Sequence, residues 1–112
     1  MTIILDESLP HGLCHILEPH QVTTVQKAGY AGMKNGALLA AIEGVFDIFI
    51  TADKNIRYQQ NLAGRQISII ELPTNRWPLL LLLQPKIIAT VDRCKPSTYE
   101  VVSAAYSTQI PQ

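Results

Sequence analysis

Residues 48–53 read Ile48-Phe49-Ile50-Thr51-Ala52-Asp53, an unbroken run of apolar and β-branched side chains that stops at an acid. A short run without polar alternation is typical of a strand that is covered on both of its faces. We therefore expect a strand over Ile48–Thr51 in a sheet with helices on both sides. Asp53 is then placed to cap a helix that follows this strand.

Further stretches on either side of this run carry a strand signal. Thr2–Leu5 is a continuous apolar run that ends at Asp6 and Glu7, and we expect a further strand over Ile67–Leu72. Val22–Val25 is β-branched throughout, which favours a strand. Tyr99–Val102 is expected to add an edge strand near the end of the chain.

Helical spacing fills the segments between these strands. We expect helices to begin at four capping residues, Ser8, Asn35, Asp53 and Asn75. Pro19, Gly44 and Gly64 would end the first three helices, and the fourth would be one long helix through Val91. The apolar stripes that would face the sheet are Leu9, Leu13, Ile16 and Leu17, then Leu38, Leu39 and Ile42, and finally Leu80, Leu83, Ile87 and Val91.

Strands that alternate with helices predict an α/β fold. We expect a three-layer sandwich built on a small, mostly parallel sheet of four to five strands. With 112 residues and 12.4 kDa the chain is long enough for one domain, which excludes a large two-domain enzyme. The domain would comprise residues 1–112. Its core would span about residues 3–91, and an edge strand and the C-terminal tail would follow at 92–112.

The composition places limits on partners and location. Nine basic and nine acidic residues leave no net charge, so any binding of nucleic acid requires a local patch. The longest apolar run, Leu79–Leu83, is far shorter than the roughly twenty residues that span a bilayer. Asp6 and Glu7 interrupt any N-terminal export signal. We therefore expect a cytoplasmic protein with no membrane partner, and we expect Cys14 and Cys94 to be free thiols.

Two acids follow strands at the edge where α/β proteins bind ligands. In an open parallel sheet this edge lies beyond the carboxyl ends of the strands. Asp6 and Asp53 belong there, and Asn35 would begin its helix at the same edge. Two converging carboxylates repel each other unless a divalent cation such as Mg²⁺ or Mn²⁺ neutralises them. The other interpretation is that both acids simply begin helices, where Asp is common.

The remaining acids are sorted by the same rule. Asp47 precedes its strand and would lie roughly 20 Å from Asp53, beyond any shared metal shell. Glu43 falls on that far side as well, whereas Glu71 ends its strand and stays an outer candidate. His11 and His15 lie opposite the apolar stripe of their helix, so we interpret them as exposed rather than as metal ligands.

Basic and aromatic residues gather near the same edge. They include Lys34 in the loop and Lys54, Asn55 and Arg57 after Asp53, and Tyr30 or Tyr58 could stack on an unpaired base. Together they predict a surface that holds a phosphate backbone. For any single one of these residues, a solvated helix face is the more ordinary role, and only their shared placement favours phosphate binding.

Four motifs follow one another along the chain. They are Ile4-Leu5-Asp6-Glu7-Ser8-Leu9-Pro10, Gly32-Met33-Lys34-Asn35-Gly36, Phe46-Asp47-Ile48-Phe49-Ile50-Thr51-Ala52-Asp53-Lys54-Asn55 and Tyr58-Gln59-Gln60-Asn61. In this order they resemble the PIN-like family related to the toxins of bacterial toxin–antitoxin modules. The similarity extends from Ile3 to about Val91.

The resemblance implies a ribonuclease that depends on Mg²⁺ or Mn²⁺ and acts on RNA as the toxin of such a module, with an antitoxin encoded nearby. It carries Asp6 and Asp53 over as metal-binding acids, and it implies supporting roles for the residues Glu7, Asn35, Thr51 and Asn55. If the enzyme is active, the cation would assist phosphodiester hydrolysis, and Lys34, Lys54 and Arg57 would hold the RNA backbone.

One departure from the family bears on activity. PIN nucleases bring three or four acids together, whereas this chain has Asn35 and Ala37 where a carboxylate is expected. An amide oxygen can coordinate a cation but adds no charge, so the metal would be held more weakly unless Glu7 or Glu71 reaches it. A catalytically silent module that binds RNA or protein is therefore one alternative, and the oligomeric state, a homodimer included, is left open.

A receiver-type phosphoacceptor domain is the other alternative. It would use Asp6-Glu7, Asp53, Thr74 and Lys95-Pro96. Against it, a polar, basic helix follows Asp53 in place of the short apolar loop that such domains usually carry.

Overall fold

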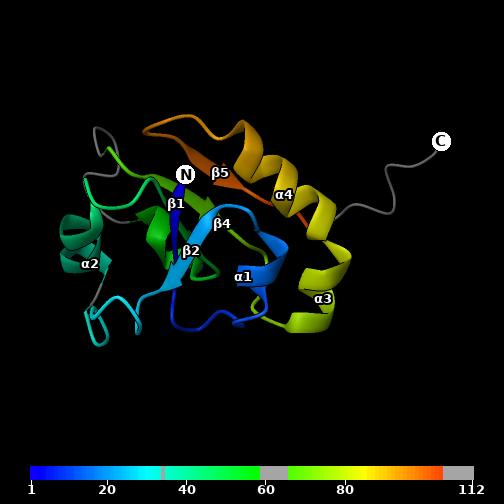
Figure 1. Cartoon of the computed structure of the whole chain (residues 1–112), viewed down its shortest axis with the longest axis horizontal. Coiled ribbons are helices and arrows are strands. Elements are labelled where there is room, and N and C mark those ends of the chain that lie inside the picture. The colour runs from blue at the N-terminus through cyan, green and yellow to red at the C-terminus, as the bar shows by residue number, and fades with distance from the viewer. Residues whose placement is uncertain (34, 59–65, 105–112) are drawn as a thin grey trace.

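The computed structural model describes residues 1–33, 35–58 and 66–104, and within these the side chains of Asn35, Arg57 and Tyr58 are left aside. The described residues form a five-stranded sheet in which every strand pair is parallel, in the order β2-β1-β3-β4-β5. This confirms the expected α/β sandwich (Figure 1). The strands are β1 (Thr2–Leu5), β2 (Gln21–Thr24), β3 (Ile48–Thr51), β4 (Ser68–Glu71) and β5 (Tyr99–Val101).

Helices cover both faces of this sheet, as its apolar strands predict. One face carries α1 (Leu13–Ile16), α3 (Trp77–Leu82) and α4 (Gln84–Arg93). The other face carries α2 (Asn35–Ile42) and a 3₁₀ helix, η1 (Lys54–Tyr58). In Figure 1, α2 lies at one end of the molecule and α1, α3 and α4 lie at the other.

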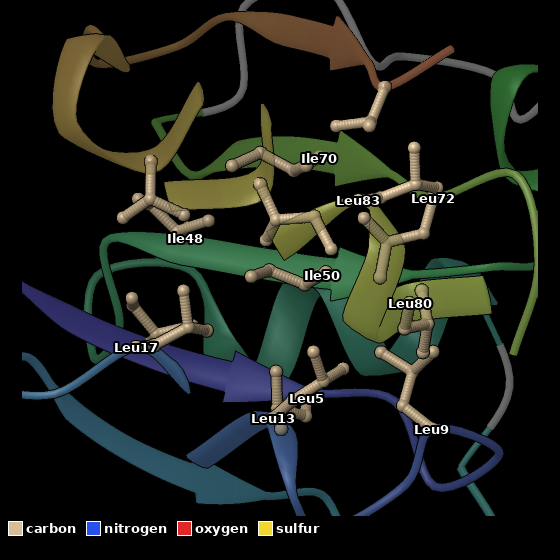
Figure 2. Close-up of a cluster of buried hydrophobic side chains, with 14 residues drawn as sticks. Leu5, Leu9, Leu13, Leu17, Ile48, Ile50, Ile70, Leu72, Leu80 and Leu83 are labelled. Carbon is tan, nitrogen blue, oxygen red and sulfur yellow. The ribbon is translucent and has the colours of Figure 1, made fainter. Parts of the chain in front are cut away.

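Alternating side chains of each strand divide the core in two. Ile3 and Leu5 of β1 point to the face of α1, α3 and α4, whereas Ile4 points to the face of α2. On the first face Leu5, Ile50 and Ile70 are fully buried. Figure 2 shows this cluster, with Leu80 and Leu83 of the helical layer against the strands. Val102 also joins this core, so the core extends past the expected limit at residue 91.

The first predicted helix is much shorter than its apolar stripe indicates. Leu9, Leu13 and Leu17 are buried as expected, but the helix covers only Leu13–Ile16 and begins after Gly12. Ser8 does not cap it, because the Ser8 hydroxyl donates to Asp6 Oδ2 at 3.1 Å. The turn that follows β1 is therefore organised around Asp6 rather than around a helix start.

The single long helix predicted from Asn75 to Val91 is also wrong. It is divided at Leu83 into α3 and α4, and α3 begins after Arg76 rather than after Asn75. Pro85 explains the break, because it has no N–H to donate to the carbonyl four residues earlier and its ring crowds that carbonyl. Both halves keep their buried stripe, which includes Leu80 and Ile87.

Other predicted boundaries agree with the structure. Gly44 ends α2 with a φ of 85°, a conformation that favours glycine. Asp53 caps η1, since its Oδ1 accepts the N–H of Asn55 at 2.9 Å. The predicted stop at Gly64 lies outside the described residues. Across the ranges described above, no helix has both the length and the apolar character to cross a membrane.

Candidate functional site

Three polar side chains form a row across the carboxyl ends of β1, β3 and β4. Leu5 pairs with Ile50, which places Asp6 beside Thr51, and Thr51 pairs with Glu71. All three face the α2 side of the sheet, because the alternation that turns Ile4 toward α2 repeats two residues later. We call these residues, Asp6, Thr51 and Glu71, the polar row.

The polar row crosses the point where the strand order reverses. β2 lies on one side of β1, whereas β3, β4 and β5 follow on the other side. The helices that connect the strands diverge at such a point, and ligands of open α/β sheets bind there. The sheet thus places Asp6 at the edge expected from sequence, and Asp53 follows the neighbouring strand.

One hydroxyl joins the two predicted acids. Thr51 Oγ1 donates to Asp6 Oδ2 at 2.9 Å and accepts the backbone N–H of Asp53 at 3.0 Å. Thr51 is only 1% exposed, so its hydroxyl forms both hydrogen bonds shielded from bulk water. This shared hydroxyl holds the segment after β3 against the end of β1.

Asp6 receives hydrogen bonds on both carboxylate oxygens. Oδ1 accepts the backbone N–H of Glu7 at 2.9 Å, and Oδ2 accepts the hydroxyls of Ser8 and Thr51. An aspartate that accepts from groups one and two residues ahead is a turn-forming device. The role of Ser8 was missed by the helix-cap interpretation, although the Asp-x-Ser spacing was visible in the sequence.

Glu7 contributes its backbone rather than its carboxylate to this arrangement. Its side chain is exposed, and its N–H donates to Asp6. Gln26 after β2 in turn donates its side-chain amide to the Glu7 carbonyl at 3.3 Å. These bonds fix the backbone of the loop after β1, while the Glu7 carboxylate stays in solvent.

Glu71 lies deeper than an outer metal ligand would. It is 1% exposed, and the Tyr99 hydroxyl of β5 donates to its Oε1 at 2.6 Å. In the sheet it stands two strands away from Asp6, on the order of 10 Å between the backbones. Within the described residues no three His, Cys, Asp or Glu side chains lie close enough to hold one metal ion. Glu71 therefore extends the polar row but does not complete a three-acid cluster.

Among the described residues, no protein cation neutralises the two acids. In the part of the chain that the structure describes, no Lys, Arg or His forms an ion pair with Asp6 or Asp53. Both residues are partly exposed. Two carboxylates that share an edge without a protein cation leave local negative charge that a bound cation could offset.

The structure describes the side chains of two predicted phosphate-binding residues, Lys54 and Asn55. Lys54 is exposed, and its ammonium donates a hydrogen bond to the Pro73 carbonyl at 3.0 Å, next to the end of β4. Asn55 is exposed on η1. Asn35 begins α2, but its side chain, the Arg57 and Tyr58 side chains, and Lys34 lie outside what the structure describes. Tyr30 packs against the α2-side core, which leaves less of its ring for base stacking.

Asp47 and Glu43 lie at the opposite edge of the sheet from Asp6 and Asp53, as expected. The position of Lys95 at this same edge weakens the receiver alternative. Asp47 Oδ2 accepts the backbone N–H and the hydroxyl of Thr2, and Glu43 Oε2 accepts the N–H of Gln66 at 2.6 Å. Lys95 precedes β5 and lines a hollow on this far edge together with Asp47. A receiver site requires its lysine beside the phosphoacceptor acid, and here it stands at the other end of the strands.

The histidines lie in or beside α1, which covers the face of the sheet opposite the polar row. His15 is exposed and lies 3.7 Å from the carboxylate of Glu18, and His11 is exposed as well. His20 instead contacts Asp92 of α4 at 3.2 Å. The exposed positions expected for His11 and His15 are confirmed.

Comparison of the chain with models of protein families, with curated proteins and with solved structures finds no match.

Proposed function

We propose that this chain is a metal-dependent ribonuclease of PIN-like type, with Asp6 and Asp53 as the residues that would hold Mg²⁺ or Mn²⁺. The observation that carries the proposal is the Thr51 hydroxyl, which joins the Asp6 carboxylate to the Asp53 backbone at the reversal of the strand order. The resemblance of the four sequence motifs supports the choice of substrate.

The chemistry of the donors is compatible with a hard divalent cation. Both candidate ligands supply carboxylate oxygens, which Mg²⁺ and Mn²⁺ prefer. Asp53 Oδ1 accepts one hydrogen bond, from Asn55, and its Oδ2 receives none within the described part of the chain. Such a cation would supply acidity to water and offset negative charge on the phosphoryl oxygens.

The residues of the chain itself would position and orient these groups. Ser8 and Thr51 hold the Asp6 carboxylate, so its direction is set before any ligand arrives. Lys54 is exposed beside this edge and would contact the phosphate backbone without reading sequence. With two acids rather than three or four, we expect weaker metal binding than a complete PIN cluster provides.

RNA cleavage in the presence of Mn²⁺ tests the proposal. Asp6→Asn and Asp53→Asn should each lower the cleavage rate by at least about 100-fold, because each removes a charged ligand. Asp92→Asn on α4, an exposed acid on the other face of the sheet, is the matched control and should cleave normally. Chelation of the metal should stop cleavage by every variant.

Thermal stability supplies a readout that is independent of activity. Mn²⁺ that binds the folded state should raise the Tm of the wild-type protein and of Asp92→Asn but not that of Asp53→Asn. RNA that is retained without cleavage, by a protein that Mn²⁺ does not stabilise, would refute the nuclease and indicate a silent binding module. A phosphodonor that labels Asp53 as an acyl phosphate would instead indicate a receiver.

The same proposal makes the chain the toxin of a toxin–antitoxin pair. Induced expression in a bacterial host should then arrest growth, and Asp53→Asn should relieve the arrest at an equal protein level. Growth that is unaffected by a demonstrably active nuclease would contradict the toxin role while leaving the nuclease in place.

A further inference from the structure

A second surface begins at Pro73, just after β4, and runs along α3, α4 and β5 on the face of the sheet that the polar row does not occupy. It contains a hollow of about 340 Å³ whose walls include Arg76, Leu79 and Leu82, and another of about 240 Å³ whose walls include Lys86 and Val101. Ser103 lines the second hollow and the next residue of the chain lines the first, so the two are continuous along the backbone. We call this surface the α3–β5 groove.

The floor of the α3–β5 groove is apolar and open to solvent. Leu79, Leu82 and Val101 are 42%, 57% and 52% exposed, although each is a large aliphatic side chain. Exposed aliphatic side chains that gather in a hollow, with polar groups around them, are typical of a protein interaction site. Scattered single exposures would carry no such meaning.

The rim of the groove is positively charged. Arg76, Lys86 and Arg93 line the two hollows, and no acid of the described residues lines them. Glu100 offsets part of this charge, since its Oε1 lies 3.5 Å from the Arg93 guanidinium. Within the described residues no acid forms an ion pair with Arg76. This concentration of cations stands out because the whole chain has no net charge.

The strand beside the groove ends the sheet. β5 pairs with β4 on one edge, and no other strand of the described ranges pairs with its outer edge. Lys86 of α4 donates to the Ser103 carbonyl at 3.2 Å, which holds the helix close to the end of this strand. An outer strand edge accepts an extended peptide, whose side chains would then alternate between the groove and solvent.

The charges and the exposed leucines favour one occupant over two others. In a twofold dimer the same patch meets itself, so a second copy of the chain would bring Arg76 and Lys86 against like charges. A nucleic acid would match the cations but not the aliphatic floor, because bases stack chiefly on aromatic rings and no aromatic side chain among the described residues lines the two hollows. An acidic peptide with aliphatic side chains matches both the rim and the floor.

We propose that the α3–β5 groove binds an extended segment of a partner protein in which acidic residues flank aliphatic ones. The aliphatic side chains occupy the hollow formed by Leu79 and Leu82, and the carboxylates lie beside Arg76 and Lys86. This inference concerns a different surface from the polar row and does not depend on nuclease activity.

Selection from a display library of random twelve-residue peptides on the full chain tests the proposal. The enriched peptides should carry acidic and aliphatic residues, and a synthetic copy of one should bind in solution with a measurable Kd. Arg76→Glu and Leu82→Ser should each weaken this Kd at least tenfold. Lys95→Glu and Val45→Ser at the far edge are the controls and should change it less than twofold, and Val45 is 58% exposed, like Leu82.

Several outcomes would overturn the assignment. The first is that no peptide is enriched, and the second is that the enriched peptides show no excess of acidic residues. The third is that the far-edge control variants lose as much affinity for the peptide as Arg76→Glu and Leu82→Ser do. Competition by a single-stranded RNA that Arg76→Glu abolishes would assign the groove to nucleic acid. A dimer in sedimentation that Leu82→Ser dissociates would assign it to a second copy. Circular dichroism of each variant establishes that the comparison is between folded proteins.

Discussion

Replacing Thr51 by valine isolates the hydroxyl on which the site depends. The two side chains have nearly the same shape, so the substitution opens no cavity in a residue that is 1% exposed. What is lost is one hydrogen bond to the Asp6 carboxylate and one from the Asp53 N–H, at 2.9 and 3.0 Å. We expect the folded state to be destabilised without a change in the rest of the core.

The structure sets the size of this effect. A hydrogen bond to a charged group contributes about 1.5–3 kcal/mol, and a buried N–H left without an acceptor costs about 1–3 kcal/mol. Because Asp6 and Asp53 are both partly exposed, water replaces some of each loss. We therefore expect the free energy of unfolding to fall by about 2 kcal/mol, which for a domain of this size lowers Tm by roughly 8 °C.

Urea unfolding followed by circular dichroism measures this change. Thr90→Val is the matched control, because Thr90 is 4% exposed and its hydroxyl bonds only the Lys86 carbonyl of its own helix, at 2.8 Å. The Thr90 hydroxyl competes with the helix backbone for this carbonyl, so its hydrogen bond contributes little to stability. We therefore expect Thr90→Val to lower the free energy of unfolding by less than about 0.5 kcal/mol. Equal unfolding midpoints for the two variants would refute the structural role of Thr51, and Thr51→Ser should recover most of the lost stability.

Three further predictions concern packing and backbone conformation. Gly12→Ala should destabilise the fold by about 1–3 kcal/mol in thermal unfolding, because the added Cβ would overlap the Trp77 ring; full stability would mean that the ring does not lie there. Gly44→Ala should lower the free energy of unfolding by about 1 kcal/mol, since Gly44 has a φ of 85°. Gly36→Ala within α2 should instead raise the free energy of unfolding by about 0.5–1 kcal/mol. Two changes of the same sign would contradict this pair of predictions. Ile70→Ala at a fully buried position should lower the free energy of urea unfolding by about 2–5 kcal/mol, and a loss below 1 kcal/mol would place Ile70 outside the core.

The positions of the strands could be predicted from the sequence because the signal is local. Ile48–Thr51 and Thr2–Leu5 are found as strands with the predicted bounds, since an unbroken apolar run has no alternative to burial on both faces. The edge assignments of Asp6, Asp53 and Asp47 followed in turn, because direction along a parallel strand determines the edge.

The helices were less predictable, for reasons that differ. The break at Leu83 had a local cause in Pro85, and the apolar stripe that continues through it concealed the cause. The shortness of α1 has a tertiary cause, because Ser8 bonds Asp6 and the backbone at Gly12 approaches Trp77 of a distant helix. A stripe of apolar residues records which side chains are buried, whereas the backbone between them can be a turn.

The sequence by itself determined the parallel α/β architecture, the buried strands and the edge that carries each acid. Only the tertiary structure decided which polar groups meet: Thr51 bonds Asp6 across 45 positions of sequence, Glu71 is bonded by Tyr99, and Lys95 lies at the opposite edge. The reason is that hydrophobic periodicity acts within one element and is read from neighbouring residues. Strand order and register arise from packing between elements, so the partners of a polar side chain are known only when the whole sheet is assembled.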